Sequence, residues 1–148
     1  MALLRFEIGD TKNKKTYGKS IENYFLTGKK IKDKVDGGLL GLNGYELEIT
    51  GGSDTAGFPM RPDIDGFGRK KIVLDAGATG FKGKKRKKAH KQNHYFMTKR
   101  KTIRGNTISQ FTQQINLKVV KYGDKSIAEL WNIAEKQAET VKTEEKKE

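Results

Sequence analysis

The first regular pattern along the chain is a strict alternation near the N-terminus. Leu4, Phe6 and Ile8 occupy every second position, and a charged residue stands in each gap between them. This period of two predicts a half-buried β-strand. The sequence GDTKN at 9–13 has the composition of a tight turn, so we expect residues 14–20 to return as the second strand of a hairpin. Residues 20–27 fit either a short helix or a further strand.

Apolar and polar positions predict four more strands. The clearest is Tyr45–Thr50, in which three apolar residues face one way and Glu or Thr faces the other. Residues 71–74, 101–109 and 116–122 are the other candidates, and the polar residues 110–114 are expected to form a hairpin loop between the last two. The stretch 51–62 contains three glycines and two prolines, so it is expected to lack regular structure.

The C-terminal part of the chain has a helical pattern instead. Ser126 followed by Glu129 fits a capping box, and apolar residues then recur at helical spacing up to Val141. We therefore predict a mainly β protein: a small barrel-like domain of short antiparallel strands with a C-terminal amphipathic α-helix. The expected division is residues 1–123 for the domain, with a basic loop at 76–104, and residues 124–148 for the helix and a frayed tail.

Charge is distributed unevenly along this pattern. From Ala76 to Gly123 the chain contains no Asp or Glu, and 13 of its 31 Lys and Arg residues lie there. The other 18 cations equal the 18 Asp and Glu residues, so the whole net charge of +13 resides in this acid-free segment. Such a segment favours a polyanionic partner, with affinity supplied by phosphate neutralisation and counterion release.

The same segment indicates which polyanion is bound. Aromatic residues beside Lys and Arg suit stacking on unpaired bases, and the chain contains no helix-turn-helix, zinc-finger or basic-zipper pattern, so RNA is favoured over duplex DNA. A membrane surface would require an apolar face beside the cations, which residues 82–91 lack. The basic residues that we predict to bind RNA are Lys82, Lys84, Lys85, Arg86, Lys87, Lys88, Lys91, Lys99, Arg100, Lys101 and Arg104.

Metal and catalytic alternatives have weaker support. His90 and His94 are four residues apart, but no carboxylate or thiol lies near them in sequence to complete a metal site. The GGSD sequence at 51–54 is not followed by the Gly-Lys-Ser/Thr of a phosphate-binding loop. A nuclease would need acids near the basic surface, and the candidates among residues 54–75 are explained equally well by local charge balance. We expect no enzymatic activity, no metal and no cofactor.

Four blocks together resemble the signature of one protein family. They are GYELEITGGSD at 44–54, GFPMR at 57–61, KRKTIRGN at 99–106 and QINLKVVKYG at 114–123. In content, order and approximate spacing they are similar to the eukaryotic and archaeal-type small-subunit ribosomal protein S6e family. The resemblance spans roughly residues 2–130.

The resemblance implies a barrel-like β-domain embedded in ribosomal RNA. It adds Gly51, Gly52, Ser53, Phe58 and Arg61 to the predicted RNA-binding residues, because the loop that carries them is expected to pack against RNA. Eukaryotic members have a long basic C-terminal helix with kinase-target serines, whereas residues 124–148 hold five cations and seven anions, so the archaeal form is the better match. No residue-level RNA contact carries over at 81–96, where this chain is longer and richer in lysine.

The sequence therefore predicts a structural constituent of the small ribosomal subunit that binds and stabilises its rRNA in translation. Its expected partners are small-subunit rRNA and neighbouring ribosomal proteins, with the chain present as a monomer within the ribosome and without membrane contact. An RNA-processing enzyme or RNA chaperone with a β-barrel RNA-binding domain is the alternative. The absence of cysteine and of a long apolar segment favours the cytoplasm.

Overall fold

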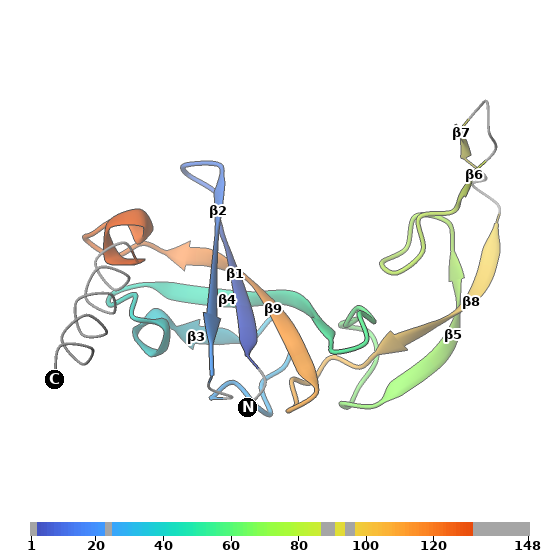
Figure 1. Cartoon of the computed structure of the whole chain (residues 1–148), viewed down its shortest axis with the longest axis horizontal. Coiled ribbons are helices and arrows are strands. Elements are labelled where there is room, and N and C mark those ends of the chain that lie inside the picture. The colour runs from blue at the N-terminus through green and yellow to red at the C-terminus, as the bar shows by residue number, and fades with distance from the viewer. Residues whose placement is uncertain (1–2, 23–24, 87–90, 94–96, 132–148) are drawn as a thin grey trace, which may run out of the picture.

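The computed structural model describes residues 3–22, 25–86, 91–93 and 97–131. Its largest element is a five-stranded sheet in the order β2-β1-β9-β4-β3 (Figure 1). The pair β1–β9 is parallel, and the other three pairs are antiparallel. The strands are β1 (Leu4–Asp10), β2 (Lys15–Ile21), β3 (Lys34–Asp36), β4 (Glu46–Asp54) and β9 (Thr112–Lys121), and a 3-10 helix, η1 (Gly37–Leu40), follows β3.

Two smaller strand pairs extend from this sheet. Strand β5 (Arg69–Asp75) pairs antiparallel with β8 (Thr98–Arg104), and β6 (Lys84–Arg86) pairs with β7 (Lys91–Asn93). Figure 1 shows that the β5–β8 ribbon projects away from the five-stranded sheet and that β6 and β7 lie at its far end. We call residues 69–104 the arm. It includes most of the cations of the acid-free segment.

The hydrophobic core lies against one face of the five-stranded sheet. The alternating residues Leu4, Phe6 and Ile8 are fully buried, as are Ile115 and Leu47 on the neighbouring strands. In the parallel pair β1–β9, Phe6 lies opposite Ile115, so side chains of the same face stack across the sheet. The alternation of the sequence thus produces one continuous apolar layer, which confirms the predicted strands at 4–8 and 45–50 and the predicted hairpin.

Strand β4 is longer than the sequence predicts. We expected irregular structure from Gly51 onwards, but the strand continues to Asp54 and pairs with β9 along its whole length. Gly52 permits this pairing, because a Cβ atom at this position would collide with the carbonyl oxygen of Gln114. Register shifts between Ile49 and Gly51 and between Ser53 and Asp54 allow β4 to stay paired with β9 up to Asp54. Irregular structure begins only after Asp54.

Gly52→Ala is therefore expected to destabilise the protein by about 1–3 kcal/mol, because strands β4 and β9 must separate to admit the methyl group. Gly51→Ala is the matched control: among the described residues no atom lies within 4 Å of its Cβ position. We expect that control to change the stability by less than about 1 kcal/mol. Urea unfolding of both variants measures the difference, and equal midpoints would contradict the close contact.

The connection between β8 and β9 also differs from the prediction. Strand β8 ends at Arg104 rather than at residue 109, and β9 begins at Thr112, inside the expected hairpin loop. The two strands do not pair with each other, because β9 lies between β1 and β4 while β8 pairs with β5. The prediction of a hairpin around residues 110–114 was therefore wrong. The strands predicted at 71–74 and 116–122 are confirmed as parts of β5 and β9.

The mainly β class is confirmed, whereas a closed barrel is not. Strands β2 and β3 are the two edges of the five-stranded sheet in the part of the chain that the structure describes. Residues 127–131 are helical, and the N–H of Glu129 donates a hydrogen bond to Ser126 Oγ at 3.3 Å, as expected for the cap. The rest of the predicted C-terminal helix lies outside the described residues. Within those residues, no helix is long and apolar enough to cross a membrane.

Candidate nucleic-acid interface

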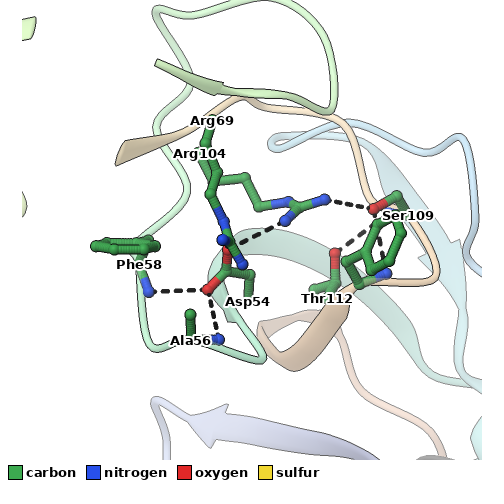
Figure 2. Close-up of polar contacts among 8 residues, drawn as sticks. Asp54, Ala56, Phe58, Arg69, Arg104, Ser109 and Thr112 are labelled. Atoms are coloured by element: carbon green, nitrogen blue, oxygen red, sulfur yellow. Dashed lines mark hydrogen bonds and ion pairs between the residues drawn. The ribbon is translucent and has the colours of Figure 1, made fainter. Parts of the chain in front are cut away.

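The carboxylate of Asp54 lies at the junction between the five-stranded sheet and the arm. Its side chain is fully buried at the end of β4. One oxygen, Oδ1, accepts hydrogen bonds from the backbone N–H groups of Ala56 (2.9 Å) and Phe58 (3.0 Å). The other, Oδ2, accepts from Arg69 Nε at 2.6 Å and from Arg104 Nη1 at 3.1 Å (Figure 2). Both arginines belong to the arm, so this single carboxylate joins the arm to β4.

The environment of Asp54 keeps it ionised. Burial alone raises the pKa of this carboxyl, but the hydrogen bonds from the Phe58 N–H and from the side chains of Arg69 and Arg104 lower it further than burial raises it. The net pKa therefore lies below its usual range. Each of these donors stabilises the charged form, so the buried ion pair is maintained across the neutral pH range.

Arg104 is a structural residue of this junction. Its side chain is 4% exposed, and Nη2 donates to Ser109 Oγ at 2.7 Å. Its backbone N–H donates to the carbonyl of Pro59, and its carbonyl accepts from the N–H of Arg61. The expectation that Arg104 contacts a phosphate does not fit this geometry, because its charge is buried and already paired with Asp54. It positions the arm instead.

The arm presents a row of exposed cations beyond this junction. Lys70 and Lys71 on β5 and Lys99 and Arg100 on β8 are all exposed. The two strands lie side by side in antiparallel register, so these four charges occupy a ribbon two strands wide. Lys101 is half-buried, and its ammonium lies 5.9 Å from the centre of the Phe81 ring. Neighbouring side chains of a strand point to opposite faces, so Lys70 and Lys99 lie on one face of this ribbon and Lys71 and Arg100 on the other.

The other predicted cations lie further along the arm. Lys82 is exposed just before the β6–β7 pair. Lys84, Lys85 and Arg86 form β6, and Lys91 begins β7. Lys87, Lys88 and both histidines lie outside the described residues. Those of the predicted basic residues from β8 to the far end of the arm that the structure describes therefore lie on one projecting element (Figure 1).

The predicted glycine-rich loop lies at the base of the arm. Gly51, Gly52 and Ser53 are half-buried residues of β4. The ring of Phe58 lies 5.2 Å from the guanidinium carbon of Arg69. Arg61 donates two hydrogen bonds of 2.8 Å to the carboxylate of Asp63.

Three of the four acidic residues at 54–75 have side-chain hydrogen-bond partners in the structure. Asp54 and Asp63 accept hydrogen bonds from arginines, and Asp65 accepts one from Asn106 at 2.9 Å. The pKa of Asp63 is lowered mainly by its hydrogen bond with Arg61, and that of Asp65 mainly by its bond with Asn106. No group of three or more His, Cys, Asp or Glu side chains placed to hold a metal occurs among the described residues.

Sequence reasoning missed part of this surface. Arg69, Lys70 and Lys71 were not selected because they precede Asp75, which ends the acid-free segment on its N-terminal side. Pairing with β8 places them beside the cations of that segment all the same. The exposed rings of Phe67 and Phe111 were also missed as possible binding groups. The sequence FGRKK at 67–71 could have indicated nucleic-acid binding here, since it combines an aromatic residue with three cations.

Comparison with known proteins shows the family of this chain. The family model for ribosomal protein S6e matches residues 4–132. The small ribosomal subunit protein eS6 of Methanocaldococcus jannaschii is 45% identical over 130 residues, covering 88% of this chain and 92% of that protein. The proteins of the same name from Nanoarchaeum equitans and Haloarcula marismortui are 44% and 39% identical, covering 75% and 88% of this chain and 75% and 95% of their own lengths. This chain therefore belongs to the ribosomal protein S6e family.

Proposed function

We propose that this chain is a structural constituent of the small ribosomal subunit that binds and stabilises small-subunit rRNA. It acts in translation, in ribosomes of the cytoplasm, as one copy among neighbouring ribosomal proteins and without catalytic activity. The observation that carries the proposal is the family match, in which the relatives are named small ribosomal subunit proteins. The projecting basic arm supplies the physical reason, because exposed cations on a narrow ribbon suit the closely spaced phosphates of folded RNA.

In this proposal, residues 1–123 are the RNA-binding domain, and the basic loop 76–104 makes most of the phosphate contacts. The predicted basic residues other than Arg104 contact phosphates, together with Lys70 and Lys71. The loop with Phe58 and Arg61 packs against RNA at the base of the arm. Lysine side chains bind phosphate as point charges, so these contacts position the protein without selecting a base sequence.

An RNA-processing enzyme is the alternative function, and the acidic residues do not support it. A metal-dependent nuclease needs carboxylates that are free to bind a cation beside the phosphate. Asp54, Asp63 and Asp65 are instead bonded to arginine or asparagine side chains. These bonds favour a structural role for the three carboxylates.

Equilibrium binding to purified small-subunit rRNA tests the proposed function. We expect a tight complex whose logarithmic affinity falls linearly with the logarithm of the salt concentration, while the RNA stays intact on a denaturing gel. Affinity that is independent of salt would contradict phosphate neutralisation. Cleavage of the RNA that depends on a divalent cation would support the enzyme instead.

A further inference from the structure

A cleft lies where the arm meets the five-stranded sheet. It is lined by Phe67, Gly68, Arg69, Arg104 and Phe111 and has a volume of ≈ 400 Å³. That volume falls within the range of roughly 300–1,000 Å³ that is typical of sites for small ligands. The lining combines two aromatic rings with two guanidinium groups. None of the basic residues predicted from sequence other than Arg104 belongs to it.

Both aromatic side chains of the cleft are more than half exposed. Phe67 is 64% exposed and Phe111 is 54% exposed, although both are large apolar side chains. The ring of Phe111 lies 5.7 Å from the guanidinium carbon of Arg104, in cation–π contact. Arg104 is itself held by Asp54 and Ser109. One side of the Phe111 ring is thus supported by a fixed group, and more than half of the residue is free to contact a partner.

The cleft also carries a net positive charge. Two guanidinium groups, those of Arg69 and Arg104, share the single carboxylate of Asp54. One positive charge is therefore left over, and it is most accessible at Arg69, whose side chain is 43% exposed. Lys70 and Lys71 follow directly and are exposed. A purely apolar occupant would not use this charge, whereas a ligand with a flat ring and a phosphate would use both features.

We propose that this cleft binds one unpaired nucleotide of RNA, with its base against Phe67 and Phe111 and its phosphate beside Arg69. The inference rests on the proposed rRNA-binding function and specifies a site within it. The nucleotide must be unpaired, because a base inside a helix is already stacked on both faces and presents only its edges. Stacking on an aromatic ring accepts any of the four bases, so the site selects an extruded nucleotide rather than a sequence.

The test compares two RNA probes that carry the same phosphates. One is a decamer of uridine, and the other is a decamer of abasic residues, each labelled for fluorescence anisotropy. We expect the wild-type chain to prefer the uridine decamer. Phe67→Ala and Phe111→Ala should each lower the affinity for the uridine decamer about 5- to 30-fold and leave the affinity for the abasic decamer and the salt dependence unchanged.

Two further variants separate stacking from simple apolar contact. Phe67→Trp should retain the preference for uridine, whereas Phe67→Leu should lose it, since leucine has no flat face. Leu39→Ala is the matched control: Leu39 is 55% exposed on η1, which follows β3, and β3 pairs with the end of β4 opposite to Asp54. We expect it to change neither affinity. Thermal unfolding of each variant verifies that the fold is kept.

The outcomes distinguish this inference from the proposed function. Equal binding of both decamers by the wild-type chain, or an unchanged preference in Phe67→Ala and Phe111→Ala, would overturn the nucleotide site while leaving rRNA binding intact. If the wild-type chain bound none of the three RNAs (the uridine decamer, the abasic decamer and small-subunit rRNA), the proposed function would be overturned as well. Loss of the uridine preference in both alanine variants, with its retention in Phe67→Trp, would establish the site.

Discussion

Replacing Lys70, Lys71, Lys99 and Arg100 by glutamine should lower the affinity for small-subunit rRNA about 100-fold at 0.15 M salt. All four side chains are exposed on the β5–β8 ribbon of the arm. Each phosphate contact releases condensed counterions, so its loss should reduce the slope of log affinity against log salt by roughly 0.7–0.9. The variant is therefore expected to show a slope that is smaller by about 3.

The control for this variant removes the same charge elsewhere. Lys14, Lys15, Lys29 and Lys32 are exposed but lie in or beside the five-stranded sheet, outside the arm. Their replacement by glutamine also lowers the net charge by four. If affinity depended only on total charge, both variants would weaken binding equally. A larger effect in the arm variant, with a smaller salt slope, assigns the phosphate contacts to the arm.

Asp54→Asn should destabilise the fold by about 3–5 kcal/mol, the range found when one partner of a buried ion pair is removed. The amide is close in size to the carboxylate, so the effect comes from the lost charge and from an NH2 group that cannot accept the hydrogen bonds of the oxygen it replaces. The side chain of Arg104 is 4% exposed, so its positive charge is buried. The substitution would leave that buried charge without the carboxylate of Asp54. Arg69 would lose less, since its half-exposed guanidinium can be hydrated. A loss of this size is a large fraction of the stability of an ordinary domain.

Urea unfolding measures this effect, and Asp63→Asn is the matched control. Asp63 also pairs with an arginine, but its side chain is 51% exposed, so we expect a change of no more than about 1 kcal/mol. The double variant Asp54→Asn/Arg104→Met should be more stable than Asp54→Asn alone, because it removes the buried charge that the single change leaves unpaired. Similar costs for Asp54→Asn and Asp63→Asn would refute the proposed role of the junction.

The local strands could be predicted because their pattern lies within a few neighbouring residues. The alternation of Leu4, Phe6 and Ile8 identifies β1, since a half-buried strand must place every second side chain in the core. Strand order was not accessible in this way. Strand β9 lies between β1 and β4, and the periodicity of its own residues does not predict which strands it pairs with. The prediction of a hairpin before β9 failed for this reason.

The candidate site shows the same division between local and long-range information. The count of charges along the chain identified the basic arm, since the acid-free segment is continuous in sequence. It predicted a phosphate contact for Arg104, whereas the structure pairs this side chain with Asp54, 50 residues away. It also missed Arg69–Lys71, which only the pairing of β5 with β8 brings beside the other cations. Gly51 and Gly52 predicted an irregular loop by composition. In the structure, Gly52 instead allows β4 to lie close to the backbone of β9 at Gln114.

Sedimentation through a sucrose gradient tests the central claim most directly. Extract from cells that produce this chain is fractionated, and the molar ratio of the chain to small-subunit rRNA is measured in each fraction. The account predicts that the chain sediments with the small subunit at close to one copy per rRNA and stays there at moderate salt. Recovery of the chain at the top of the gradient, with small subunits that lack it, would contradict its role as a constituent of the subunit.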